Sequence, residues 1–239
     1  MEKSRYILSI IAVVFFMITG CEKKVSTEDD SIVTNFVAFD LEGGELLTIP
    51  KGGAFVDPGY VAMEGTEDVT DDVEIIGTVN GTQVGLYEVT YVAVNKDGYE
   101  SSVTRTVIVY DPAAPATDIT GSYSSTIDRR HLVTGAHAVR NAGYETSITK
   151  LAPGFFYVSD FFGGYYEFGA GYGPSYAMNG FIQLNADNTL TYVSSLIPGW
   201  GDSLDDMTGG TYNPSTNVVF WKAYYVGLYE FNVTSTKQP

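Results

Sequence analysis

Short stretches in which apolar and polar residues alternate run through the chain from about residue 32 onward, separated by turn-forming residues. Alternation with a period of two places every second side chain on the same face of a strand. No long window after residue 21 shows the 3.6-residue spacing of an amphipathic helix. The pattern therefore predicts an all-β protein built of antiparallel strands.

Residues 32–111 contain the clearer series of predicted strands. The longest alternation covers 85–94, and residues 102–110 alternate again. Asn80-Gly81 is a strong signal for a tight turn between two strands. Strands that follow one another at a spacing of roughly ten residues, with turns between them, predict a β-sandwich.

Three motifs in this region add a second argument: Phe55-x-Asp57-Pro58-Gly59-Tyr60, Gly85-x-Tyr87-x-Val89-x-Tyr91 and Thr104-Arg105-x-Val107-x-Val109. Together they resemble the bacterial Ig-like module found in pesticidal crystal proteins and in many cell-surface proteins. The resemblance implies an Ig-like β-sandwich of the kind that usually serves as a spacer or an adhesive stalk.

A second domain is predicted over residues 117–239, after a stiff Pro/Ala linker at 112–116. Its strands are predicted over residues 144–150, 155–160, 178–184, 189–194, 217–221 and 228–233. The stretch Asn185-Ala186-Asp187-Asn188 predicts a hairpin turn between two of them. About eight short strands at hairpin spacing fit an antiparallel β-barrel or a second sandwich, and the sequence leaves both open.

The start of the chain has a different pattern. Lys3 and Arg5 precede an apolar run, and small residues then lead to Cys21, the only cysteine of the chain. The run is shorter than the roughly 20 residues that a membrane span needs, and its layout is that of a secretory signal. The cysteine after Ile18-Thr19-Gly20 resembles the lipobox of bacterial lipoproteins, which implies a lipid on Cys21 and a membrane partner reached through it.

We therefore expect residues 1–20 to be a lipoprotein signal peptide and residues 21–31 a flexible tether. The acidic residues Glu28-Asp29-Asp30 resemble the export signals of surface lipoproteins from gut anaerobes that use polysaccharides. This resemblance implies a lipid-anchored protein on the exposed side of the outer membrane.

Charge narrows the range of partners. The chain carries 13 basic and 29 acidic residues, a formal net charge of −16, which repels nucleic acid. It contains only two histidines, and no metal-ligand spacing accompanies them. We expect no nucleic-acid partner, no metal and no cofactor.

The highest density of aromatic residues lies between Phe155 and Tyr176, where glycines interrupt the run. Rings in a Gly-rich loop cannot all face one core, and exposed rings suit the apolar faces of sugars. A cluster that fills the core is the alternative. Trp200, followed by Asp202, is either a second stacking ring or a plug at the barrel end, whereas Trp221 lies in a predicted strand and is expected in the core.

The candidate ligand-binding residues are Tyr165, Tyr166, Tyr172, Trp200, Asp160 and Asp202. The order of anchor, Ig-like spacer and C-terminal β domain resembles small lipoproteins of starch-utilisation-type systems, on residues such as 180–190 and 210–214. The resemblance implies a glycan-handling context. We expect non-catalytic binding of a polysaccharide or oligosaccharide. The alternative is a structural subunit that docks on an outer-membrane transporter, and a glycoside hydrolase using paired carboxylates is a third possibility.

Overall fold

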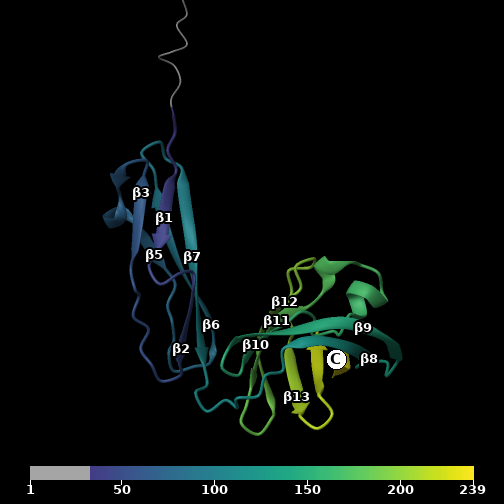
Figure 1. Ribbon diagram of the computed structural model, residues 1–239. Coiled ribbons are helices and arrows are strands. Elements are labelled where there is room, and N and C mark those ends of the chain that lie inside the picture. The colour runs from purple at the N-terminus through teal and green to yellow at the C-terminus, as the bar shows by residue number, and fades with distance from the viewer. Residues whose placement is uncertain (1–32) are drawn as a thin grey trace, which may run out of the picture. The chain divides into compact units, whose positions relative to one another are not determined.

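The structure is a computed structural model that describes residues 33–239 (Figure 1). In this part of the chain the regular structure is almost entirely β, which confirms the predicted fold class. None of its helices is long and apolar enough to cross a membrane. The predicted signal peptide, the tether and Cys21 lie outside the described residues.

Two sheets form the N-terminal domain, as in an Ig-like sandwich. The first sheet contains β1 (Val37–Leu41), β3 (Tyr60–Glu64) and β4 (Glu67–Asp68). The second contains β2 (Leu46–Pro50), β7 (Glu100–Tyr110), β6 (Gly85–Val94) and β5 (Glu74–Ile76), with a 3-10 turn, η1 (Thr70–Asp72), before β5. β6 covers the strand predicted from alternation. The sequence missed β2, which ends in a proline and pairs in parallel with β7 at the sheet edge.

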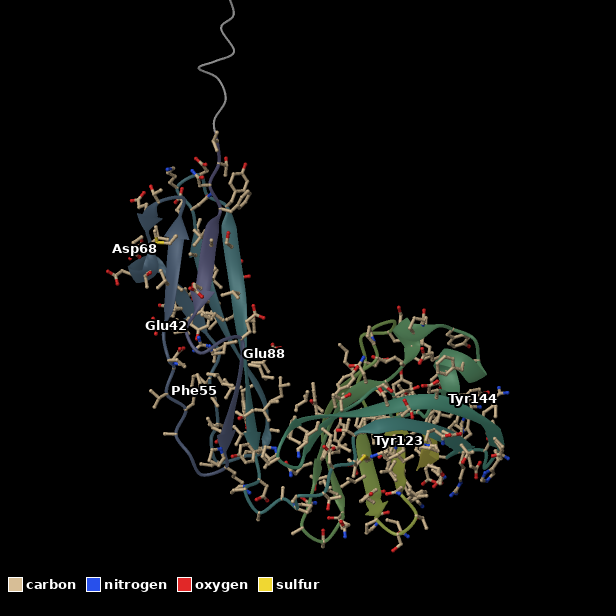
Figure 2. The ribbon with its side chains drawn as sticks, in the orientation of Figure 1. Glu42, Phe55, Asp68, Glu88, Tyr123 and Tyr144 are labelled. Carbon is tan, nitrogen blue, oxygen red and sulfur yellow. The ribbon has the colours of Figure 1, made fainter. Side chains whose placement is uncertain are left out.

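Arg105 on β7 is the buried polar centre of this domain. Its Nη1 donates to Asp57 Oδ1 at 2.5 Å, and its Nη2 donates to the carbonyls of Glu42 at 2.7 Å and Gly59 at 3.0 Å. The Tyr91 hydroxyl donates to the other oxygen of Asp57. One buried ion pair thus ties the loops around β3 to the β6–β7 hairpin, which gives the Asp57 and Arg105 motifs a structural role. Figure 2 labels Glu42, whose backbone carbonyl accepts one of the hydrogen bonds from Arg105.

The C-terminal domain is a single antiparallel sheet of eight strands in the order β12-β11-β10-β9-β8-β15-β14-β13. Their bounds are β8 (Gly121–His131), β9 (His137–Ala152), β10 (Phe155–Val158), β11 (Asn179–Leu184), β12 (Leu190–Leu196), β13 (Asp206–Asn213), β14 (Val218–Tyr225) and β15 (Tyr229–Lys237). An isolated bridge between Thr189 and Thr211 links the two ends of the sheet. The sheet therefore curls almost into a closed barrel, which resolves the choice between barrel and sandwich.

Alternate residues of these strands fill the inside of the barrel. Trp221 is almost fully buried, and its indole Nε1 donates to the carbonyl of Phe161 at 2.8 Å, which confirms the prediction of a core residue. Tyr123, labelled in Figure 2, is also buried, and its hydroxyl donates to the carbonyl of Ile119 at 2.5 Å. Both polar tips find a partner, so these large rings are buried without an unpaired donor.

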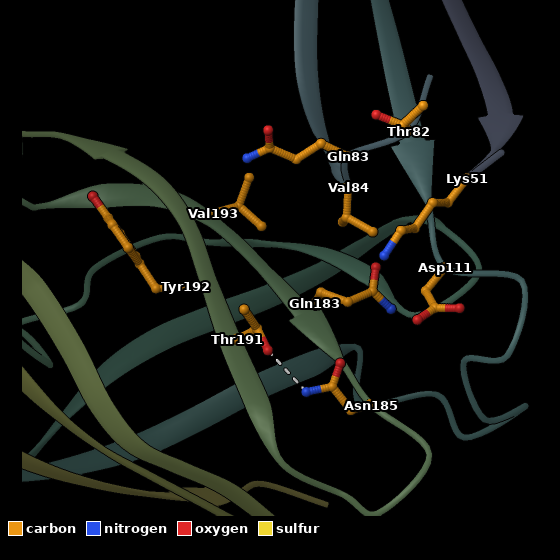
Figure 3. Close-up of a pocket in the computed structure, with 10 residues that line it drawn as sticks. All are labelled: Lys51, Thr82, Gln83, Val84, Asp111, Gln183, Asn185, Thr191, Tyr192 and Val193. Carbon is orange, nitrogen blue, oxygen red and sulfur yellow. Dashed lines mark hydrogen bonds between the residues drawn. The ribbon is translucent and has the colours of Figure 1, made fainter. Parts of the chain in front are cut away.

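The β11–β12 hairpin shows how closely the turn residues follow the sequence. Asn188 adopts a positive φ of 63°, as asparagine does readily in tight turns. Asn185 Nδ2 donates to Thr189 Oγ1 and to Thr191 Oγ1, both at 2.8 Å, and Figure 3 shows the second bond. The predicted turn between Asn185 and Asn188 is confirmed.

Candidate functional site

The aromatic run between β10 and β11 folds back on the barrel. A π-helical turn, η2 (Tyr165–Gly169), and a 3-10 turn, η3 (Pro174–Tyr176), occupy it. Gly164 precedes η2 with φ of 90°, and a Cβ there would lie 2.6 Å from the Cβ of Tyr144. Only glycine allows this close approach. The turn splits the aromatic residues into one set that faces the core and one that faces outward.

Asp160 holds the two ends of this loop together. The side chain is fully buried, and its Oδ1 accepts from the backbone amides of Phe162 at 2.8 Å and Met178 at 3.0 Å. Its Oδ2 accepts from the amide of Gly164 at 2.8 Å. Burial raises the pKa of Asp160 to about 7, although the three amides oppose the shift. No oxygen of Asp160 faces the surface, so its predicted role as an acceptor for a ligand does not fit.

Tyr165 and Tyr166 are buried as well. Both rings pack against Phe231 of β15, and Tyr166 also contacts Phe162. The sequence placed them among the exposed stacking rings, and the structure corrects this. The π-helical turn directs both rings inward, where they pack against Phe231 as part of the barrel core.

Three other rings lie on the surface, and we call Tyr172, Tyr176 and Trp200 the aromatic platform. Tyr172 is 54% exposed and Trp200 is 40% exposed. The centroid of Tyr176 lies 4.9 Å from that of Trp200 and 5.4 Å from that of Tyr172. The three rings line an open hollow of about 430 Å³. Tyr172 and Trp200 belong to the predicted site, and Tyr176 completes it.

Buried rings support the platform from below. Tyr166 lies nearly parallel to Tyr172, with 5.9 Å between centroids and 13° between planes, and its ring is 5.0 Å from Trp200. Tyr225 lies 6.1 Å from Trp200 at 21°. The Tyr225 hydroxyl donates to Asp202 Oδ2 at 2.8 Å, and burial together with this carboxylate raises the pKa of Tyr225. Asp202 itself is exposed, and this hydrogen bond fixes the orientation of its carboxylate beside the platform.

A tight turn presents Trp200. The amides of Ile197 and Gly201 close it, donating to the carbonyls of Asp202 and Ile197 respectively, both at 2.8 Å. The amide of Gly199 donates across to the carbonyl of Ser175 at 2.6 Å. A Cβ on Gly199 would lie 2.8 Å from a ring carbon of Tyr176. The Trp200 turn and η3 thus pack directly on each other, so the platform is preformed.

The sequence did not single out Tyr225, Arg129 or Arg140, although all three approach this end of the barrel core. The two arginines lie over the ring of Tyr165. The period of two along residues 121–131 and 218–225 could have revealed Arg129 and Tyr225, because it places each of them on the same strand face as buried residues.

Comparison with known proteins agrees with this layout. A family model for the Ig-like domain of bacterial surface proteins matches residues 39–109, and the model of a C-terminal domain matches residues 112–237. Among solved structures, the lipoprotein BT2262 from Bacteroides thetaiotaomicron is 40% identical in sequence. The alignment covers 84% of this chain and 100% of that chain, with a TM-score of 0.48. The chain belongs to the same family as BT2262.

The family model over residues 39–109 confirms the resemblance to a bacterial Ig-like module, and the model over residues 112–237 agrees with a separate C-terminal domain. A second solved structure, the CBM51-2 and INT domains of Clostridium perfringens ZmpB in complex with GlcNAc, is 17% identical. It covers 52% of this chain and 29% of that chain with a TM-score of 0.27, which is too low to bear on fold or ligand. No curated protein matches the chain.

Proposed function

We propose that this protein is a membrane-anchored lipoprotein that binds glycans through the aromatic platform, without catalysis. The exposure of Trp200 and Tyr172 around an open hollow carries the proposal. The C–H face of a sugar packs well on such rings, and the carboxylate of Asp202 beside them can accept hydrogen bonds from hydroxyl groups. Because buried rings hold the platform in place, binding costs little ordering entropy.

Weak binding at one such site fits a protein that is displayed in many copies. Each aromatic contact adds about 0.5–1.5 kcal/mol beyond the burial of area. Tethering many copies to one membrane raises the effective concentration of sites along a polymer, so that avidity compensates for the shallow hollow. A lipid on Cys21 and an outer-membrane location would provide this arrangement, and the lipoprotein in the same family supports it.

A binding role also suits the placement of the acids. Hydrolysis of a glycosidic bond needs two carboxyl groups that face the substrate. Both oxygens of Asp160 are turned into the loop and accept backbone amides, and one oxygen of Asp202 accepts the Tyr225 hydroxyl. We therefore assign these acids to positioning and to hydrogen bonding.

The test removes one platform ring at a time from the purified full-length protein in detergent. Retention on a panel of immobilised polysaccharides should fall about threefold to tenfold for Trp200→Ala and for Tyr172→Ala. The matched control is Tyr99→Ala in the Ig-like domain, because Tyr99 is 54% exposed, as is Tyr172. Unchanged retention by both platform variants would refute glycan binding at this site.

The same variants separate binding from docking on an outer-membrane transporter. If the platform docks on a protein, the two variants keep any glycan retention and lose co-purification with membrane partners. The anchor has its own test. Cys21→Ser should abolish incorporation of labelled fatty acid and should move the protein out of the membrane fraction, whereas Ser31→Ala in the expected tether should change neither.

A further inference from the structure

Arg129 and Arg140 lie side by side on the inner face of the barrel. In the β8–β9 ladder Arg140 pairs with Ile127 and Arg129 pairs with Ala138. Directly paired residues of antiparallel strands share a face. Ile127 is buried in the core, so both arginines point to the same side as the core, near the end of β8.

Aromatic faces surround the two guanidinium groups. The Arg129 guanidinium carbon lies 4.9 Å from the ring centroid of Tyr165 and 4.7 Å from that of Tyr229. The guanidinium carbon of Arg140 lies 5.5 Å from the ring of Tyr165. Ring faces attract cations, but they leave the N–H groups at the edge of each guanidinium available for hydrogen bonds.

Neither arginine has an acidic partner among residues 33–239. The ion pairs in this part of the chain join Lys96 to Glu64, Arg105 to Asp57 and His137 to Asp128. The Nε atoms of Arg129 and Arg140 are buried without a hydrogen-bond partner. In a protein with 29 acidic residues, two adjacent cations without a carboxylate form an unusual local arrangement.

The acids nearest in the ladder are held on the other side of the sheet. Asp128 precedes Arg129 and accepts from His137 Nδ1 at 2.9 Å. Glu230 pairs with Arg130 across β8 and β15 and accepts from the Tyr224 hydroxyl at 2.9 Å. Alternation along the strands therefore keeps both carboxylates away from the inner face.

Two buried rings connect the arginines to the aromatic platform. Tyr165 lies under both guanidinium groups, and its ring centroid is 5.1 Å from that of Tyr166. The Tyr166 ring stacks on Tyr172 and meets Trp200 edge-on. The cationic pair and the platform thus lie at the same end of the barrel, linked by the contacts of Tyr165 with Tyr166 and of Tyr166 with Trp200.

We propose that Arg129 and Arg140 bind an anionic substituent of the glycan, so that the ligand is an acidic polysaccharide carrying carboxylate or sulfate groups. The proposal rests on glycan binding by the platform. A guanidinium group matches both anions in geometry, since two parallel N–H groups meet two oxygens. The net charge of −16 repels a polyanion at long range. Salt at physiological concentration screens this repulsion between exposed charges beyond about 8 Å. Contacts between charges in a partly buried site are screened less.

Two matched pairs of probes test the proposal on the full-length protein. Polygalacturonic acid is compared with its fully methyl-esterified form, and carrageenan with agarose, so one arm reports carboxylate and the other sulfate. We expect about tenfold or stronger binding of the acidic member in at least one pair. If both members of each pair bind equally well, and Trp200→Ala abolishes that binding, the proposal of an acidic ligand is overturned but glycan binding by the platform stands. Absence of retention on all four probes would overturn both proposals.

The arginine variants then distinguish recognition from packing. Arg140→Gln should lower the preference for the acidic member about tenfold. Arg140→Lys should keep only part of it, because lysine retains the charge but not the two parallel N–H groups. Binding of the neutral member should not change in either variant. Arg130→Gln removes the same charge from the exposed outer face of β8 and should keep the full preference. A preference that survives Arg140→Gln combined with Arg129→Gln would refute the assignment.

Discussion

The Ig-like domain and the barrel handle buried charge in opposite ways. In the Ig-like domain Arg105 lies 5.6 Å from the ring of Tyr91 and also binds the carboxylate of Asp57. In the barrel Arg129 lies over tyrosine rings without a carboxylate, and the buried carboxylate of Asp160 accepts only backbone amides. Opposite charges are joined in one domain and kept apart in the other.

This difference separates a structural role from a functional one. An ion pair whose carboxylate and both Nη groups are hydrogen-bonded locks loops together and leaves no terminal group for a ligand. Separated charges cost stability, and one of them stays available to an external partner. This contrast fits a spacer role for the Ig-like domain and the binding role that we propose for the barrel.

Arg105→Ala should give the largest loss of stability. It leaves the partly exposed Asp57 carboxylate without its cation and two backbone carbonyls without their donor, and we expect a cost of about 3 kcal/mol, at the low end for a buried pair. Urea unfolding of the full-length protein, followed by circular dichroism, measures the free energy. Arg130→Ala on the exposed face of β8 is the control and should stay near the wild type. A cost for Arg105→Ala below about 1 kcal/mol would break the contrast between the domains.

Asp160 should make stability depend on pH. Its pKa is about 7 in the folded protein against an ordinary value of 3.8 for aspartate, so between these pH values the folded state holds a proton that the unfolded state has lost. The resulting stabilisation is present at pH below about 4 and is lost as pH rises through 7, by up to about 1.4 kcal/mol per pH unit.

Asp160→Asn removes this titration. It also lowers stability at every pH, because the side-chain NH2 group then faces the Gly164 N–H and both groups are donors. The measured quantity is therefore the slope between pH 4 and pH 7, obtained from urea unfolding at each pH. The wild type should have the steeper fall, and equal slopes would show that Asp160 stays ionised throughout.

Gly199→Ala tests whether the platform is preformed. The new Cβ would meet Tyr176 at 2.8 Å and the Ser175 carbonyl at 2.9 Å, so the Trp200 turn must move away from η3. Overpacking of this kind costs about 1–3 kcal/mol, and we expect glycan retention to fall with it. Pro198→Ala, an exposed neighbour in the same turn, should retain binding. Full retention by Gly199→Ala would mean that the rings need no fixed arrangement.

Arg140→Gln should have the smallest effect on stability. A partly exposed cation over a ring contributes about 0.5–1 kcal/mol, and no ion pair is broken. Thermal unfolding measures the change. A loss of stability as large as that of Arg105→Ala would show that Arg140 has a structural role in the core, and it would argue against a role in ligand binding.

Much of the fold could be predicted from the sequence, because alternation along a strand is local. The β6 strand, the Asn185–Asn188 turn and the buried Trp221 follow from residues that are close in sequence. The exceptions have physical causes. β13 contains two adjacent glycines at a bulge between Thr208 and Thr211, and this irregularity hides its period.

The candidate site was predictable only in part. The density of rings between Phe155 and Tyr176 marked the correct segment, and Tyr172 and Trp200 are exposed as expected. Which rings face outward depends on the π-helical turn and on contacts between distant segments, such as Gly199 with Ser175. Composition carries no information about such contacts.

The sequence by itself determined an all-β chain with an Ig-like domain and a second β domain, since these features follow from period and turn chemistry. Only the tertiary structure decided that Tyr166 is a support and Trp200 a surface ring, and that Arg129 and Arg140 meet over Tyr165. Exposure and charge pairing arise where strands far apart in the chain come together, so curling of the sheet into a barrel sets them.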